Sequence, residues 1–187
     1  MIPDDPWFPL RTERLLLREF RESDFDDVHE YARDPRVAHF MEWGPNALEE
    51  TRAFMQRQFE AQAQWPRGAV NLAAEHLADR KLIGSIRLSV SDPVHLQGDL
   101  GYSFNSDYWG QGYATEAARA LLDVGFRVLG LHRIWAECNV ENAASWRVMQ
   151  RLGMRREAHI LEGKHIKGRW RDGYVYAILE HEFRETR

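Results

Sequence analysis

Apolar residues recur every three or four positions between residues 114 and 129, a spacing that indicates an amphipathic helix with one buried face. The positions on this face are Ala114, Ala117, Ala118, Leu121, Leu122, Gly125, Val128 and Leu129. Arg119, Asp123 and Arg127 lie mostly off the stripe, and we expect Gly130 to end the helix. The N-terminus of this helix should therefore be anchored against a core.

The rest of the chain alternates between strand-like and helical patterns after an N-terminal arm at residues 1–12. Strands are predicted at 14–20, 70–76, 82–90, 99–104, 132–139, 154–162 and 174–183, with a hairpin turn at 78–80 and a loop at 91–98. Helices are predicted at 22–33, from 35, at 47–64 and at 142–152, with Ser23 and Asn46 as N-caps and Gly153 as C-cap. This order predicts one α/β domain over residues 1–187, with a mixed sheet and helices on both faces.

Composition narrows the class of protein. The net charge of −4 argues against a nucleic-acid partner, because such domains are usually strongly basic. No apolar run approaches the roughly 18–20 residues that a membrane span needs, and the first residues lack the layout of a signal peptide. A single cysteine cannot form an internal disulfide, so the cytoplasm is the expected compartment.

Two glycines, Gly110 and Gly112, stand between a strand-like run and the long helix. The first N–H groups of a helix point outward and carry partial positive charge, and glycine lets an anion approach them. We therefore expect the segment from Gln111 to Thr115 to cradle a pyrophosphate, although such a turn can need glycine for geometry alone. The spacing excludes both a P-loop and the dinucleotide-binding fingerprint.

The segment Tyr108 to Ala117 resembles the acyl-CoA motif of the GNAT acetyltransferases. Asn139 to Met154 looks like the motif that follows it in the ribosomal-protein N-acetyltransferase branch, and 12–18 and 170–176 are similar to that branch as well. Many GNAT members carry Gln or Arg at the first position of this motif. This chain has Trp109 there, and tryptophan at this position is common in the branch. The resemblance implies a mixed, mainly antiparallel sheet of six to seven strands, with a cleft between its two central strands.

The same resemblance implies that acetyl-CoA and an amine bind together in this cleft, in a ternary complex. The pantetheine amides would pair with the backbone near Ser103 and Phe104, Asn142 would reach the coenzyme arm, and Ser145 would hydrogen-bond the departing sulfur. Ser145 could instead only satisfy a backbone N–H. Trp146 stands near the place where other branches put a tyrosine as the acid for the thiol. The expected coenzyme-binding residues are Ser103, Phe104, Trp109, Gly110, Gln111, Gly112, Tyr113, Ala114, Thr115, Asn142 and Ser145.

Amine attack on a thioester needs a neutral amine, and this requirement bears on the acceptor. An α-amine with a pKa of about 7.7–8.0 is roughly one part in seven neutral at pH 7, whereas lysine near 10.4 is neutral about once in 2,500. An N-terminal acceptor therefore asks little of a base. Asp99 is the first candidate base and Glu137 the second, although both could be ordinary strand carboxylates. Strand alternation places Glu137 with Trp135 and Asn139.

Other residues carry weaker signals. Cys138 shares a strand face with apolar residues and should be an inert core thiol rather than an acyl carrier. The histidines, including His132 and His165, show no ligand spacing, so no metal is expected. Trp43, Trp65 and Trp170 could wall an acceptor pocket or simply pack at edges. Glu42, Glu49 and Glu50 could attract a cationic amine, or be solvated residues at a helix start.

The sequence thus predicts an acetyl-CoA-dependent N-acetyltransferase that acts on a protein or peptide α-amine. One alternative is a transferase for a small amine, such as a polyamine, an amino acid derivative or an aminoglycoside-like drug. Another is a protein that binds acyl-CoA as a sensor without turnover. The family branch also makes a homodimer plausible.

Overall fold

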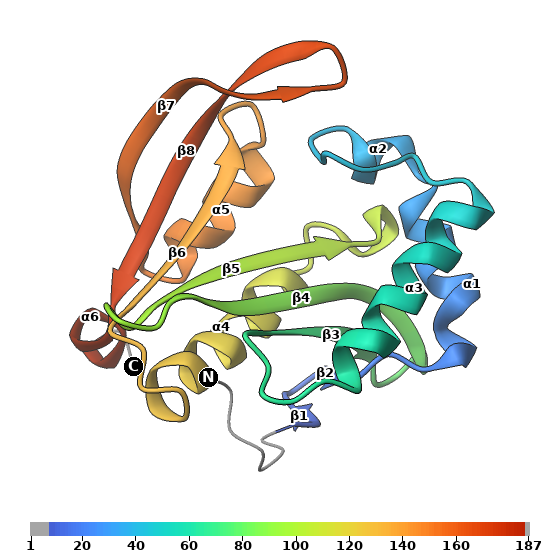
Figure 1. The fold of residues 1–187 in the computed structure, drawn as a ribbon, viewed down its shortest axis with the longest axis horizontal. Coiled ribbons are helices and arrows are strands. Elements are labelled where there is room, and N and C mark those ends of the chain that lie inside the picture. Colours follow the sequence, from blue (N-terminus) through green and yellow to red (C-terminus); the bar gives the residue numbers. More distant parts are fainter. Residues whose placement is uncertain (1–7, 186–187) are drawn as a thin grey trace.

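The computed structural model describes residues 8–185 as one eight-stranded sheet flanked by helices (Figure 1). The strands are β1 Leu10–Arg11, β2 Leu15–Arg18, β3 Ala69–His76, β4 Lys81–Asp92, β5 Gln97–Phe104, β6 Arg133–Asn139, β7 Arg155–Ile166 and β8 Arg169–Leu179. The α-helices are α1 Phe25–Ala32, α2 Pro35–Ala38, α3 Leu48–Gln62, α4 Tyr113–Arg127, α5 Ala143–Arg151 and α6 Glu180–Glu185. Short 3-10 helices, η1 Glu22–Asp24 and η2 Ser106–Tyr108, precede α1 and follow β5.

The strands lie in the order β1-β2-β3-β4-β5-β6-β8-β7, and every described neighbouring pair is antiparallel except β5 with β6. This confirms the predicted α/β fold with a mixed, mainly antiparallel sheet. The sheet has eight strands rather than six or seven because β1 adds a two-residue ladder to β2 within the predicted arm. In Figure 1, β5 and β6 start side by side and then diverge.

Helices cover both faces of the sheet, as predicted, and the period-two alternation of the strands assigns side chains to two cores. On one face, Leu72 and Ile86 pack in the same cluster as Leu121 of α4. On the other face, Ala73 belongs to a second cluster with Val28 of α1. Adjacent β3 residues therefore face opposite sides of the sheet. Strands β2–β5 form one wing of the sheet, which is packed on both faces, and β6, β8 and β7 form the other wing.

Several local predictions were wrong in detail. Asp24 rather than Ser23 is the N-cap of α1, and Ser23 lies inside η1. Ala47 rather than Asn46 is the N-cap of α3, where the Glu50 carboxylate accepts a hydrogen bond from the Ala47 amide. The predicted loop at 91–98 is a tight turn, because β4 runs to residue 92 and β5 begins at 97. The last strand ends at residue 179 and is followed by α6.

The ends of the chain limit what the fold tests. Residues 1–7 of the predicted arm, and 186–187, lie outside the described residues, so one domain over 1–187 stays a prediction. None of the helices within residues 8–185 combines the length and apolarity needed to cross a membrane. The predicted cytoplasmic location stays a prediction.

Candidate active site

The parting of β5 from β6 opens the candidate active site. β5 pairs with β4 from residue 97 to residue 104, but with β6 only through residues 97–99. Alternate amide and carbonyl groups at 100–104 therefore face a gap without a strand partner. A cavity of about 820 Å³ lies here, between the two wings of the sheet and the segment that joins α2 to α3. This is the predicted cleft between the central strands.

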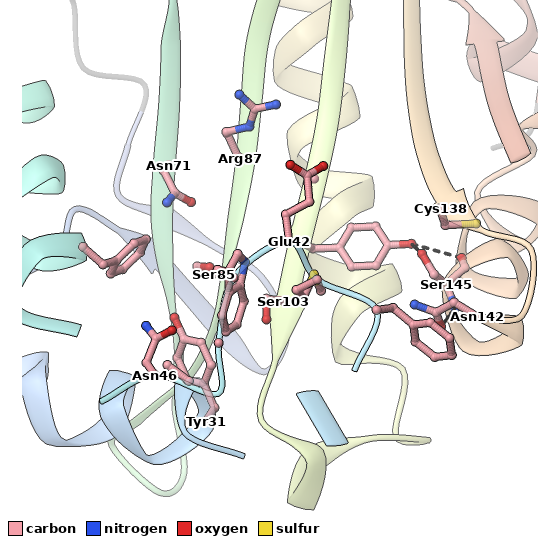
Figure 2. Close-up of a pocket in the computed structure, with 18 of the residues that line it drawn as sticks. Tyr31, Glu42, Asn46, Asn71, Ser85, Arg87, Ser103, Cys138, Asn142 and Ser145 are labelled. Atoms are coloured by element: carbon pink, nitrogen blue, oxygen red, sulfur yellow. Dashed lines mark hydrogen bonds between the residues drawn. The ribbon is translucent and has the colours of Figure 1, made fainter. Parts of the chain in front are cut away.

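One end of the cavity holds a hydrogen-bonded group from β5 and α5. The Tyr102 hydroxyl donates to the Ser145 carbonyl oxygen at 3.0 Å and lies 3.1 Å from the Ser145 Oγ. Asn142 is the N-cap of α5, and its Oδ1 accepts from the Ser145 amide at 3.1 Å. The Ser145 hydroxyl thus contacts a phenol rather than a backbone N–H. Ser145, Asn142 and Cys138 lie together in Figure 2, and burial raises the pKa of Tyr102.

The predicted pyrophosphate cradle lies after β5, at the start of α4. Gly110 and Gly112 have φ of +77° and +88°, a left-handed conformation that favours glycine. A β-carbon on Gly112 would meet only an Arg14 nitrogen at 3.5 Å, so conformation rather than crowding requires glycine. The first amide to join the helical ladder is that of Glu116, which donates to the Gly112 carbonyl. The amides of residues 113–115 therefore precede the ladder and remain available to an anion.

An ion pair braces this cradle. The Glu116 carboxylate accepts from the Thr12 hydroxyl at 2.6 Å, the Arg14 amide at 2.8 Å and the Arg14 Nε at 2.7 Å. Arg14 also donates from Nη1 to the Gln111 carbonyl at 2.9 Å and lies over the Tyr113 ring. Although burial opposes ionisation, these hydrogen bonds lower the pKa of Glu116. The loop is thus held by the start of β2, a contact the sequence alone did not predict.

Two predicted coenzyme-binding residues, Phe104 at the end of β5 and Trp109 in the turn after it, are bonded to each other. The Phe104 carbonyl accepts a hydrogen bond from the Trp109 indole at 2.8 Å, so this carbonyl is already engaged. The Phe104 ring is buried in the core, while Ser103 lines the cavity. Trp109 is 47% exposed, so burial contributes little to its position. Its contribution to the turn after β5 is the hydrogen bond from its indole N–H.

The two candidate bases occupy different places. Asp99 lies where β5 is still paired on both sides, its carboxylate forms an ion pair with Arg87, and it is not among the residues that line the cavity. Glu137 lines the cavity from β6, where its Oε1 is 3.5 Å from Lys164 Nζ. Burial lowers the pKa of Lys164, but the carboxylates of Glu42 and Glu137 outweigh it and leave that pKa raised.

The other half of the cavity lies against α1, α3 and the α2–α3 segment. Trp43, Glu42 and Glu50 line it, and its role as an acceptor pocket stays a prediction. The other two tryptophans and Glu49 are not among the lining residues: Trp65 packs under Arg67, Trp170 lies against His165, and Glu49 is exposed at the start of α3.

Several lining residues carried no usable signal in the sequence. They are Tyr31, Phe54, Arg57, Asn71, Ser85, Arg87 and Lys167. Strand alternation separates Arg87 from Ile86 and Leu88, but the register that sets Arg87 beside Asn71 and Gly101 appears only in the folded sheet. Figure 2 shows Asn71 and Arg87 on the opposite side of the cavity from Ser145.

Comparison with known proteins identifies the family. Residues 14–155 match the model of the acetyltransferase (GNAT) domain. The chain belongs to the GNAT acetyltransferase family. It is 38% identical over 174 residues to YnaD, an uncharacterized N-acetyltransferase of Bacillus subtilis strain 168, a match that covers 93% of this chain and 98% of YnaD.

Two further relatives represent the two kinds of acceptor that the sequence left open. The solved ribosomal-protein-S5-alanine acetyltransferase of Vibrio fischeri shares the fold, with a TM-score of 0.80 at 23% identity over 93% of this chain and 97% of that chain. The spermidine N(1)-acetyltransferase of Escherichia coli strain K12 is 27% identical over 105 residues, 56% of each chain. The predicted family resemblance is confirmed, and this GNAT protein is an N-acetyltransferase.

The residues present fit acetyl-CoA, the acetyl donor of GNAT enzymes. Three buried side-chain oxygens within residues 8–185 lack a hydrogen-bond partner, namely Gln62 Oε1, Ser103 Oγ and Thr115 Oγ1. Buried polar groups are rarely left unsatisfied, so each one calls for a partner. Two of the three lie at predicted coenzyme-binding positions. The open β5 edge and the amides at the start of α4 complete a donor set suited to amides and a diphosphate.

The remaining sequence candidates behave as core or structural residues. Cys138 is buried, and burial raises the pKa of its thiol to about 11, which keeps it protonated and inert at neutral pH. His132 and His165 do not line the cavity. Within the described part of the chain no three His, Cys, Asp or Glu side chains gather as a metal site would require, and the absence of a metal stays a prediction.

Proposed function

We propose that this GNAT protein transfers the acetyl group of acetyl-CoA directly to a peptide or protein α-amine bound in the same cavity. The observation that carries the proposal is the arrangement of that cavity. Its β5–β6 end holds Tyr102 and Ser145, while its other half is lined by β3, β4 and α3. A thioester and an amine can thus meet from opposite sides, as a ternary complex requires.

On the donor side, the main chain and two hydroxyl groups act. The amides at 113–115 hold the pyrophosphate, and the open edge of β5 holds the pantetheine amides. Acetyl-CoA supplies the thioester: as the new C–N bond forms the amine gives up a proton to Glu137, and the C–S bond breaks to release the coenzyme as a thiolate. Ser145 Oγ stabilises this sulfur by hydrogen bonding and is itself oriented by Tyr102 at 3.1 Å. Tyr102 is a positioning residue, since the raised pKa of its phenol disfavours ionisation.

Glu137 is the base we assign. It shares the cavity with the donor end, whereas the Asp99 carboxylate is held by Arg87 outside the lining. An α-amine needs only weak assistance because part of it is already neutral at pH 7; lysine would face a deficit of about 4.6 kcal/mol. Glu137, which also pairs with Lys164, is therefore a sufficient base for an α-amine, either directly or through a water that it holds.

Direct attack is supported by the state of the one cysteine. A covalent acyl-enzyme would need a thiolate nucleophile in the cavity. Cys138 borders the cavity, but its thiol pKa of about 11 leaves almost no thiolate at neutral pH.

A small amine is the second candidate acceptor, and the similarity to spermidine N(1)-acetyltransferase favours it. A polyamine site, however, needs free carboxylates to hold a second ammonium group. The carboxylates that line this cavity are engaged: Glu42 and Glu137 pair with Lys164, and Glu50 caps α3. This favours an α-amine over a polycation.

The proposal is tested by coenzyme release with a thiol reagent across a panel of amines. We expect the fastest release with peptides that have a free N-terminus, slower release with their Nα-blocked, lysine-containing versions, and weak release with spermidine. Mass spectrometry should place the acetyl group on the α-nitrogen. Tight coenzyme binding without release for any amine would replace the proposal with the sensor hypothesis.

A further inference from the structure

The cavity lining holds as many carboxylates as cationic side chains, but these groups differ in whether they already have partners within the protein. Three cationic side chains line the cavity: Arg57, Arg87 and Lys167. Lys167 donates to the carbonyls of Ala38 and Trp43, so main-chain oxygens occupy it. The carboxylates in the lining are engaged as described above. Of the two arginines, Arg57 has no such partner among the described residues, and Arg87 keeps Nε and Nη1 beside its ion pair with Asp99.

Arg57 has no counter-ion among the residues that the structure describes. It extends from α3 on the face that also presents Glu50, Ala53 and Phe54, which follow the i, i+3, i+4, i+7 spacing and all line the cavity. Arg57 is exposed and makes no described contact that fixes its side chain. A guanidinium directed along a cavity wall is suited to a carboxylate, which it can bind through two parallel hydrogen bonds.

Arg87 adds a second guanidinium to the lining of the same cavity. Its Nη2 bonds Asp99, its side chain is 48% exposed, and no acceptor within the described chain bonds its Nε or Nη1. Asn71, its cross-strand neighbour on β3, donates from Nδ2 to Gln58 and adds another polar group to the same wall. Arg57, Asn71 and Arg87 all line this cavity, and Asn71 links β3 to the residue that follows Arg57 on α3, so these three residues are called here the arginine wall.

We propose that the arginine wall binds a side-chain carboxylate of the acceptor, so that the substrate class is a peptide or protein with an acidic residue at or next to its N-terminus. This inference rests on the proposed function and specifies its acceptor. The carboxylates that line the cavity, Glu42, Glu50 and Glu137, are each bonded within the protein, which lessens their repulsion of such a ligand.

The register of the sheet sets the spacing. Gly101 on β5 is paired with Arg87 on β4, which is paired with Asn71 on β3. Neighbouring strands lie about 4.8 Å apart, so the wall is about 5–10 Å from the β5 edge where the thioester binds. The α-carboxylate of a free amino acid is attached to the same carbon as its amine. It therefore lies too close to the reacting amine to reach the arginine wall. A chain rises about 3.3–3.6 Å per residue, so an acidic side chain on residue one or two spans the distance.

Gly101 leaves the path open between the two ends. Its φ is not positive, and a β-carbon there would meet nothing nearer than Arg87 Nε at 4.0 Å. Neither backbone conformation nor packing requires glycine at this position. The missing side chain gives the acceptor room to cross β5 toward the arginine wall.

The test uses two peptides of equal length that differ only at the second residue, Ser-Asp and Ser-Asn, with acetyl-CoA saturating. For the unmodified protein we expect kcat/KM about tenfold or more higher for Ser-Asp. Arg57→Gln should reduce this preference to about twofold, mainly by lowering kcat/KM for Ser-Asp. Arg57→Glu should reverse it in favour of a Ser-Lys peptide. The dissociation constant of CoA should stay constant throughout.

Arg52→Gln is the matched control. Arg52 lies on the same helix, is exposed, packs over the Phe25 ring and does not line the cavity. This variant should keep the preference for Ser-Asp. Equal rates for the two peptides in the unmodified protein, or an Asp preference that survives Arg57→Glu, would overturn the arginine wall. So would Arg57-dependent acetylation of free aspartate without acetylation of the peptides.

Failure of this inference is distinguishable from failure of the proposed function. Efficient acetylation of Ser-Asn or of spermidine, unaffected by Arg57, would leave the transferase intact and remove the carboxylate site. Binding of CoA without turnover of any amine would remove both.

Discussion

Glu116→Gln offers a direct test of how the coenzyme cradle is held. The substitution preserves size and leaves one oxygen to accept from the Thr12 hydroxyl and the Arg14 amide. The new amide NH2 would then face the Arg14 guanidinium, which now donates to the carboxylate from Nε at 2.7 Å and lies within 2.7 Å through Nη2. Two donors cannot share a hydrogen bond, so Arg14 loses its partner and its hold on the Gln111 carbonyl weakens.

The magnitude follows from exposure. Hydrogen bonds to charged groups contribute about 1.5–3 kcal/mol each, but Arg14 is 38% exposed and Glu116 only 16%, so solvent reduces the value of the pair. We expect a net loss of about 2 kcal/mol in the free energy of unfolding. For a chain of this size that corresponds to a fall in Tm of about 4–8 °C. The dissociation constant of CoA should rise several-fold, because the cradle is no longer preorganised.

The pH dependence has a definite sign. The pKa of Glu116 is lowered in the folded protein relative to its ordinary value of 4.5. Its contribution to stability is therefore fully present above about pH 4.5 and is lost as the pH falls through the folded pKa. The stability difference between the unmodified protein and Glu116→Gln should be constant near pH 7 and shrink in acid.

Urea unfolding and calorimetric CoA binding, each measured at pH 7 and in acid, provide the assay. Asp123→Asn in the same helix is the control, because it removes a surface ion pair with Arg127 and should cost at most about 0.5 kcal/mol. If Glu116→Gln matched this control in both stability and CoA affinity, the cradle would not depend on the ion pair and our account of it would be refuted.

Three further predictions concern the chemistry. Ser145→Ala should lower kcat about tenfold with the CoA dissociation constant nearly unchanged, and an unchanged kcat in steady-state assays would discard its role at the sulfur. Glu137→Gln should lower kcat/KM at neutral pH more than Asp99→Asn does, and pH–rate profiles in which only Asp99→Asn loses the acidic limb would reverse the assignment. Cys138→Ala should keep kcat within about threefold, whereas trapping of an acetylated Cys138 by mass spectrometry would contradict direct attack.

The fold was predictable because its signals are local. The apolar stripe of α4 and the period-two alternation of β3, β4 and β6 identify elements and most buried positions without tertiary information. Val128 is an exception, because it follows the end of α4 and is 47% exposed. Burial alternates along β6 as predicted, with Ile134, Ala136 and Cys138 inside. Helix caps were harder to predict. Ser23 and Asn46 have side chains suited to an N-cap, but a carboxylate inside the helix, such as that of Glu50, can bond the free amide at the helix start instead.

The proposed coenzyme side of the site could be predicted in part from the sequence, whereas the proposed acceptor side could not. The Gly110–Gly112 turn and Asn142 lie in contiguous motifs, so the chain itself carries their spacing. The bracing of the cradle by Arg14 is a contact across 102 positions to Glu116, and no pattern along the chain encodes it. The arginine wall needs the register of β3, β4 and β5 together with the position of α3. Such a surface exists only after folding.

A sheet that separates between two central strands exposes polar edges, and the remaining contacts explain why this sheet tolerates it. β5 keeps its full ladder with β4, and β6 pairs with β8 over seven residues, so each strand beside the gap is still paired on its other side. The wings are joined again across the cavity, where Lys164 bonds Glu42 and Lys167 bonds the Ala38 carbonyl. An unpaired strand edge attracts any extended chain with amide groups. Pantetheine has that chemistry, which supports our proposal that this break in the sheet holds the coenzyme, while Lys164 and Lys167 tie the two sides of the cavity together.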